Sequence, residues 1–115
     1  MALETVAKMV SSARVLLQDI IPGYRNSDAD LLDALNTGLI EASRIRPDLF
    51  IFSEAGVPQY SAVDATVIAI DQQFLPALLH YVIGHIEMQD AEGNKVERVN
   101  MLMGRFTGKL LAVAA

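Results

Sequence analysis

The stretch SDADLLDALNTGLIEASRIRPDLF, which begins at Ser27, constrains the fold most because it carries a start, an apolar face and an end for one helix. Ser27 can accept hydrogen bonds from the first turn, and the aspartates that follow favour the positive end of the helix dipole. At helical spacing the apolar residues share one broad sector: Leu31, Leu32, Leu35, Leu39, Ala42 and Ile45. Because a proline disfavours helical geometry in the residue before it, Pro47 ends the helix at Arg46. This amphipathic helix must bury its apolar face against other parts of the chain.

Three further segments show apolar residues at helical spacing and can cover that face. They run from Leu3 to Ile21, from Asp71 to about Asp90, and from about Lys95 to Val113. The middle one, capped by Asp71, is apolar on most sides, so we expect it at the centre of the fold. Gly38, inside the apolar sector of the central helix, lets a neighbouring helix approach closely at a cost of about 1 kcal/mol. We therefore predict an all-α, four-helix bundle-like fold in a single domain that spans residues 1–115.

Residues 48–70 form a segment of different character between the second and third helices. The runs LFIF and ATVIAI favour short extended structure on either side of a turn that contains Gly56 and Pro58. We predict an inserted loop with weak strand content or a small β-hairpin here. A loop this long is usually functional or mobile, so we expect it to be mobile in the isolated monomer and to contact another subunit or a partner.

Composition excludes several classes of protein. The chain contains no cysteine, which rules out disulfides and thiolate metal sites, and its net charge of −5 argues against a dedicated nucleic-acid binder. No apolar run reaches the ~18 residues of a membrane span, and the N-terminus lacks the pattern of a signal peptide. The hydrophobic content of 52% fits either a helical core rich in Ala and Val or burial in an oligomer, and composition leaves both open.

No pattern in the sequence predicts an enzyme, a cofactor or a metal site. His80 and His85 point about 140° apart on a helix, so they cannot easily share one metal ion. We expect His85 to pack against the backbone or Tyr81, and His80 to lie at a surface or a subunit contact. The aspartates after Ser27 lack the glycine and the terminal glutamate of a calcium loop, and the sequence shows no glycine-rich phosphate loop or nucleophile elbow.

Two sets of residues are candidates for contacts with other chains. Around the central helix and in the loop, side chains expected at the surface predict contacts with a neighbouring subunit or another protein: Arg25, Ile40, Arg44, Arg46, Asp48, Phe50, Phe52 and Tyr60. The alternative for the charged members is a solvated face with surface pairs worth about 0–1 kcal/mol each. The C-terminal run is apolar and uncharged, which predicts either continuation of the last helix into the core or a docking tail: Leu110, Leu111, Ala112, Val113, Ala114 and Ala115.

Three stretches of the chain form a distinctive arrangement. They are ARVLLQD from Ala13, GYRNSDADLLDALNTGLIEASRIRPDLF from Gly23, and IDQQFLPALLHYVIGHIEMQDAEG from Ile70. The most specific part is the pairing of YRNSDADLLDALN with RPDLF, followed by FLPALLHYVIGH after a loop. This arrangement, which covers most of the chain, resembles the small helical head–tail adaptor, or connector, proteins of tailed bacteriophages.

The resemblance implies a structural virion protein in the neck of the particle, present in the host cytoplasm during assembly. Such proteins form a homo-oligomeric ring, commonly of twelve copies, between the portal protein and the tail or nozzle protein. Double-stranded DNA passes through the ring without specific binding, and no membrane is involved. In this interpretation residues 110–115 dock on the portal. The alternative, from a different class, is a soluble helical regulatory or partner-binding module.

Overall fold

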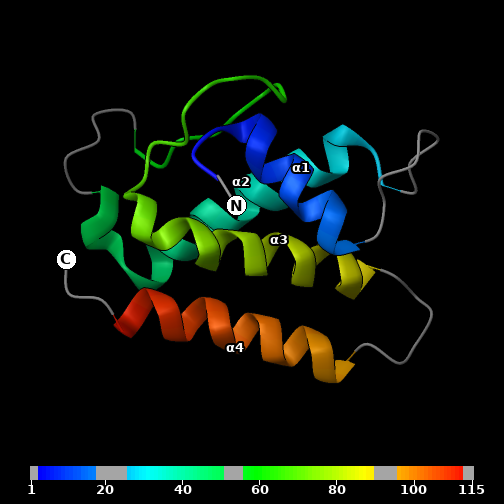
Figure 1. The fold of residues 1–115 in the computed structure, drawn as a ribbon. Helices are drawn as coiled ribbons and strands as arrows, with labels where there is room; N and C mark the ends of the chain where they lie inside the picture. The colour runs from blue at the N-terminus through cyan, green and yellow to red at the C-terminus, as the bar shows by residue number, and fades with distance from the viewer. Residues whose placement is uncertain (1–2, 18–25, 51–55, 90–95, 113–115) are drawn as a thin grey trace.

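The structure is a computed structural model that describes residues 3–17, 26–50, 56–89 and 96–112. These residues form four α-helices and two short 3-10 helices (Figure 1), which confirms the predicted all-α fold. The α-helices are α1 (Val6–Leu17), α2 (Asp28–Ile45), α3 (Leu75–Gln89) and α4 (Val96–Ala112), and the 3-10 helices are η1 (Pro47–Phe50) and η2 (Gln72–Phe74).

Helix α2 has the start and the end that its sequence predicts. The Ser27 hydroxyl accepts a hydrogen bond from the backbone N–H of Asp30 at 3.1 Å. The helix stops after Ile45 because Pro47 follows Arg46, its C-cap residue, and begins η1. Its predicted apolar residues are buried, apart from Ile45, which is half-buried. The local chemistry of this stretch is therefore sufficient to define the helix.

Helix α3 lies at the centre of the fold, as predicted. It contacts α1, α2 and α4, and it lies between α4 on one side and α1 with α2 on the other (Figure 1). Leu78, Val82 and Ile83 are almost completely buried. One detail of the prediction is corrected: Asp71 accepts a hydrogen bond from the N–H of Gln73 and so caps η2, and α3 itself begins only at Leu75.

Two glycines allow the neighbouring helices to approach α3 closely. A Cβ atom on Gly38 of α2 would lie 2.9 Å from Cδ1 of Tyr81, which confirms the predicted role of this glycine. A Cβ atom on Gly84 would lie 2.9 Å from Cε of Met103 on α4, a contact that the sequence reading missed. Small residues therefore occupy both the α2–α3 and the α3–α4 contacts.

Of the two predicted alternatives for the segment between α2 and α3, its described residues fit a loop with little extended structure. Leu49 lies in η1, not in an extended run, and Val67 instead forms an isolated antiparallel bridge with Thr5. The backbone N–H of Val6 donates to the carbonyl of Thr66 at 3.0 Å, and that of Ile68 donates to Glu4 at 2.9 Å. The loop therefore pairs with the start of the chain and supplies acceptors to the free N–H groups of α1. Residues 51–55 lie outside the described part.

The same pairing bears on two other expectations. Residues 3–5 belong to the contact with the loop, so α1 begins at Val6 and not at Leu3, and the predicted end at Ile21 lies outside the described residues. Residues 56–70 make hydrogen bonds to the start of the chain and to α2, while their predicted mobility in the isolated monomer stays a prediction. Helix α4 agrees with its predicted bounds within one residue at each end.

The central position of α3 predicts a large difference between two substitutions on the same helix. Leu78→Asp places a carboxylate in the core without a partner, and we expect it to reduce the free energy of unfolding by about 4 kcal/mol or more. Met88→Asp, at a side chain that is 62% exposed, is the matched control and should have little effect. Thermal unfolding of both variants, followed by circular dichroism, measures the difference, and equal melting temperatures would contradict the core assignment.

Candidate interaction surfaces

Arg46, predicted as an intermolecular contact, instead ties the ends of α2 and α4 together. Its guanidinium donates two hydrogen bonds to the carboxylate of Asp48, at 3.1 and 2.8 Å, and one to the carbonyl of Leu110 at 2.6 Å. It also lies over the ring of Phe74, with 5.6 Å between Cζ and the ring centroid. Its side chain is only 12% exposed. The hydrogen bonds from Arg46 hold the pKa of the Asp48 carboxyl below its usual value of 3.8.

The C-terminal run is part of α4 for as far as the structure describes it. Leu110 is completely buried in the core, so its assignment as a portal contact is wrong. It continues the stripe of apolar residues that packs α4 on the rest of the fold. Leu111 and Ala112 are exposed on the last turn, whereas Val113, Ala114 and Ala115 lie outside the described residues.

The aromatic residues of the loop are less available than expected. Phe50 is buried, so the expectation that it is exposed is wrong, and Phe52 and Arg25 lie outside the described residues. Tyr60 is half-buried, and its hydroxyl accepts a hydrogen bond from the N–H of Ala69 at 2.7 Å. These contacts belong to the fold of the monomer.

Asn36 on α2 fixes the loop through the backbone of Tyr60. Its side-chain amide donates to the carbonyl of Tyr60 and accepts from the N–H of Tyr60, each at 2.8 Å. The loop also donates a side-chain hydrogen bond to α2, from the amide of Gln59 to the carbonyl of Asn36 at 3.2 Å. A single polar residue on the outer side of α2 gave no signal in the sequence that could have identified this role.

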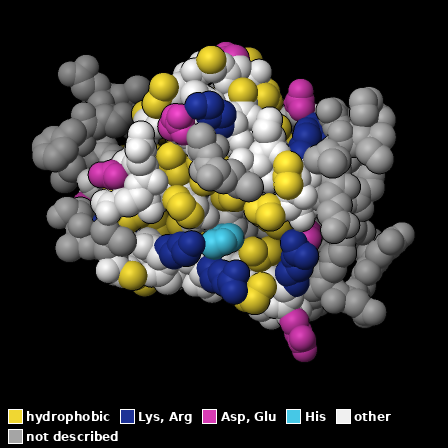
Figure 2. All heavy atoms as spheres, viewed as in Figure 1, with side chains coloured by type: hydrophobic (Ala, Val, Ile, Leu, Met, Phe, Trp, Pro, Cys, Tyr) yellow, Lys and Arg dark blue, Asp and Glu magenta, His cyan; other side chains and the backbone are white. Residues whose placement is uncertain are grey.

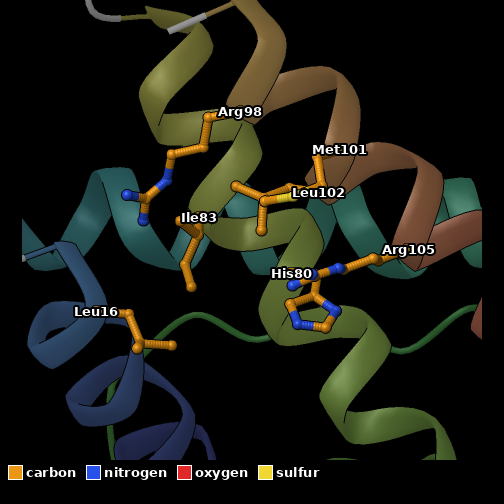
Figure 3. Close-up of a pocket in the computed structure, with 7 residues that line it drawn as sticks. All are labelled: Leu16, His80, Ile83, Arg98, Met101, Leu102 and Arg105. Atoms are coloured by element: carbon orange, nitrogen blue, oxygen red, sulfur yellow. The ribbon is translucent and has the colours of Figure 1, made fainter.

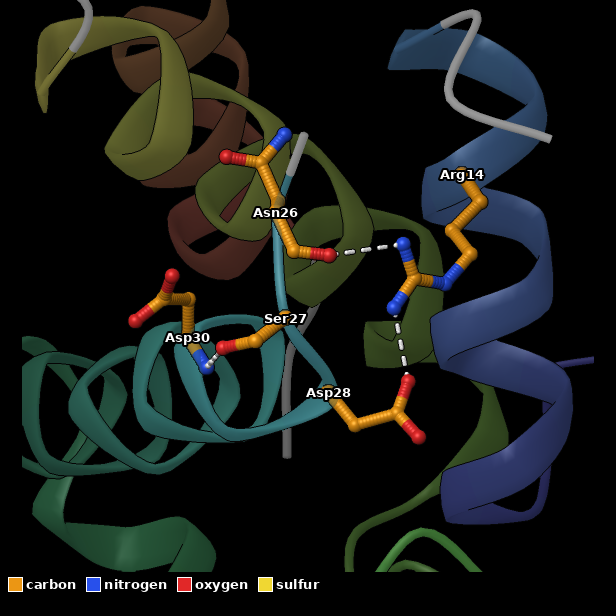
Figure 4. A network of polar contacts seen from close by, with 5 residues as sticks. All are labelled: Arg14, Asn26, Ser27, Asp28 and Asp30. Carbon is orange, nitrogen blue, oxygen red and sulfur yellow. Dashed lines mark hydrogen bonds and ion pairs between the residues drawn. The ribbon is translucent and has the colours of Figure 1, made fainter. Parts of the chain in front are cut away.

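A second polar network joins α1 to the start of α2 (Figure 4). Arg14 is buried, and its guanidinium donates to the carboxylate of Asp28 at 2.6 Å and to the carbonyl of Asn26 at 2.9 Å. From the sequence alone, these aspartates are expected to interact with the positive end of the α2 dipole. Asp28 has the additional task of holding Arg14, and hence α1, against α2.

A hollow of about 230 Å³ opens between α1, α3 and α4 (Figure 3). Ile83 and Leu16 point toward each other across it, and Arg98 and Arg105 reach over it from α4. The complete lining is Leu16, His80, Ile83, Arg98, Met101, Leu102 and Arg105. Figure 2 shows Lys and Arg side chains beside hydrophobic ones on this face, around one histidine. The hollow combines apolar walls with cationic edges in a chain whose net charge is −5.

The charges at this hollow affect its histidine. Burial, followed by the positive charges of Lys109 and Arg105, lowers the pKa of His80 below the usual 6.5. Arg98 is held differently, because its Nε lies 2.9 Å from Oε2 of the buried Glu87 on α3. The other histidine, His85, stacks on Tyr81 with 5.8 Å between the ring centroids, as predicted.

The outward faces of α2 and α4 carry apolar side chains that the fold leaves exposed. Ile40 on α2 is 44% exposed, and it keeps its place as a contact candidate together with Arg44 beside it. On α4, Met101 is 47% exposed and Leu111 is 61% exposed. Isolated exposed apolar residues are ordinary, but here they lie on helices whose opposite faces are already packed in the core of the monomer.

The described residues offer little for metal chemistry or membrane insertion. In the part of the chain that the structure describes, no group of three or more His, Asp or Glu side chains could hold a metal ion. No helix in that part has the length and the apolar composition that crossing a bilayer requires. No protein-family model, curated protein or solved structure matches this chain.

The two hydrogen bonds between the Asn36 side chain and the backbone of Tyr60 can be tested by removing that side chain. Asn36→Ala leaves the N–H and the carbonyl of Tyr60 without their partner, and we expect a loss of about 1–3 kcal/mol in the free energy of unfolding. Thr37→Ala is the matched control, because the Thr37 hydroxyl bonds only to the carbonyl of Asp33 within its own helix. Amide hydrogen exchange should accelerate at Tyr60 in the first variant alone. Equal exchange in both variants would show that other contacts fix the loop.

The lowered pKa of His80 predicts a pH dependence of stability. Between the folded-state pKa and 6.5, the unfolded chain binds more protons at this position than the folded protein does. The contribution of His80 to stability is therefore complete above pH 6.5 and falls as the pH drops through this window. We expect His80→Gln to flatten the slope of melting temperature against pH in this range. An unchanged slope would show that His80 does not cause this pH dependence.

Proposed function

We propose that this protein is a structural head–tail adaptor of a tailed bacteriophage. In this proposal it forms a ring between the portal and the tail that extends the channel for double-stranded DNA. The observation that supports it best is the exposure of apolar side chains on two separate helices, Ile40 on α2 and Met101 on α4. A subunit of a closed ring needs two different lateral surfaces, because each copy contacts one neighbour with each of them.

The segments that carry the resemblance to adaptors also form the framework of the fold. ARVLLQD contributes Arg14, which holds Asp28 in the second segment, and RPDLF contributes the Arg46–Asp48 pair. The segment FLPALLHYVIGH lies in η2 and α3, the central helix. The motif is thus a set of residues that stabilise one another, which explains why they occur together in one chain. The resemblance thus falls on residues that hold this fold together, and the proposed assembly role rests on the exposed faces.

The proposal assigns each surface a partner. Leu111 and Ala112, with the three residues that follow them, contact the portal, and Ile40 with Arg44 contacts a neighbouring subunit or the tail. The ring contains about as many copies as the portal beneath it, commonly twelve, and needs neither a cofactor nor catalysis. The protein acts in the neck of the virion after assembly in the host cytoplasm.

A second candidate function is a soluble module that binds one partner. The observation that favours it is the hollow between α1, α3 and α4, where Arg98 and Arg105 border the apolar side chains of Leu16 and Met101. Such a surface suits an acidic segment with apolar side chains, since opposite charges steer encounter and apolar contacts stabilise the complex. A monomer that binds such a segment but never binds a portal would favour this alternative.

The adaptor function predicts attachment to a portal ring. The full chain, co-expressed with the portal protein of the genome that encodes it, should appear in electron micrographs as a ring on the portal. Leu111→Asp should weaken this attachment, because a carboxylate would have to lose its hydration in the contact, whereas Asn100→Asp on the same helix should not. A wild-type chain that never cosediments with the portal, and is absent from purified virions, would rule the function out.

A further inference from the structure

The outward face of α4 contains two glycines that the fold of the monomer does not explain. Glycine disfavours a helix interior, and Gly38 and Gly84 have a clear reason for it, because a Cβ atom there would meet a neighbouring side chain at 2.9 Å. Around Gly104 and Gly108, in contrast, the described residues place no atom within 4 Å of the position that a Cβ would take, apart from the flanking residues and the backbone of α4 itself. The absent side chains leave room on the outside of the molecule.

These glycines form a stripe with two other exposed residues. Glu97, Met101, Gly104 and Gly108 are spaced by three or four residues, so they lie in line along one side of α4. The opposite side packs into the core through Val99, Leu102, Phe106 and Leu110. The outward stripe thus has an acidic residue at one end and an apolar side chain next to it. Beyond Met101 it continues into a shallow glycine-lined surface with Arg105 and Lys109 at its edge.

The outward face of α2 has the reverse order of charge. Asp33, Ile40 and Arg44 are exposed on the side of α2 that faces away from α3, with Thr37 between the first two. The apolar Ile40 therefore lies between a basic residue, one turn away, and an acidic residue, two turns away in the other direction.

The two faces match when the helices run antiparallel. With Ile40 against Met101, Arg44 lies opposite Glu97, since each is four residues from the apolar centre. Within the monomer Arg44 already pairs with Glu41 at 3.0 Å, and its side chain is 73% exposed, so Glu97 of the second copy would add to that pair. Asp33 then lies opposite Gly108, beside Lys109, because both separations are seven residues. In a parallel arrangement with the same centre, Arg44 would meet Arg105, and like charges in contact are unfavourable. The order of charges therefore selects one orientation.

We propose that the outward face of α4 docks antiparallel onto the outward face of α2 of a second copy of this chain. The inference rests on the proposed function in taking the neighbour to be another copy, and it names the two faces that meet. Because these faces differ, every bound pair keeps one free face at each end, and further copies add until the ring closes. Each contact alone is weak, and closure of the ring sums many of them.

Cysteine cross-linking tests the pairing directly, because the natural chain contains no cysteine. The double variant with Ile40→Cys and Met101→Cys should form a ladder of disulfide-linked multimers under mild oxidation. The control carries Ile40→Cys and Met88→Cys, which places the second thiol at a methionine outside the stripe that is more exposed than Met101, 62% against 47%. No ladder beyond that of the control would overturn the docking. Portal binding, tested separately above, decides the adaptor function independently.

Mixing two broken variants tests the head-to-tail arrangement. Ile40→Asp damages only the α2 face and Met101→Asp only the α4 face, and both residues are exposed, so both variants should fold. Each variant alone should lose self-association in sedimentation, whereas an equimolar mixture should form dimers that grow no further. Loss of association in the Met101→Asp variant alone would indicate α4–α4 pairing and overturn the proposal.

A charge exchange provides a third arm that leaves the apolar residues unchanged. Arg44→Glu and Glu97→Arg should each reduce the cross-linking yield, and the two together should restore it, since the ion pair is re-formed with its sign reversed. Gly104→Leu fills the stripe without changing any charge and should also abolish the ladder. Failure of the exchange to restore the yield, with both variants folded, would overturn the antiparallel register.

Discussion

The burial of α3 on several sides is the interaction on which the rest of the structure depends. Helices α1, α2 and α4 each pack against it, and Gly38 and Gly84 allow two of them to do so at close range. The half-buried ring of Tyr81 joins α2 to α4, since it lies against Gly38 and its centroid is 4.9 Å from that of the Phe106 ring. Once α3 is covered, the outer faces of α1, α2 and α4 remain exposed, and the proposed contacts between copies use those of α2 and α4.

Sequence reasoning predicted the features that depend on neighbouring residues in the chain. The bounds of α2, its Ser27 cap, the role of Gly38 and the central position of α3 all follow from local spacing and turn chemistry. The hydrogen bonds of Arg14, Asn36 and Arg46 could not be predicted, because their partners are distant in sequence or are backbone carbonyls that carry no signature. Leu110 shows a different kind of error: its periodicity placed it in the core, but the apolar composition of the C-terminal run suggested a docking tail.

The described candidate contact residues differ in how available they are once the fold is known. Ile40, Arg44, Leu111 and Ala112 are exposed and keep their proposed roles. Arg46, Phe50 and Leu110 act inside the monomer, since burial or hydrogen bonds occupy them. The residues that the proposed docking adds are Glu97, Met101, Gly104 and Gly108. None of them is distinctive alone, and the proposal rests on their alignment along one side of α4.

The pairing between the loop and α1 has a consequence for the order in which the chain folds. Helix α1 has 12 residues, a length at which an isolated helix is barely stable in water. Its first N–H groups find their acceptors in Asp64 and Thr66, about half the chain later. During synthesis, α1 therefore leaves the ribosome before this loop and can complete its structure only after the loop has followed. Until then its apolar residues Val6, Met9 and Val10 stay uncovered, which makes the beginning of this chain the part that a chaperone would meet.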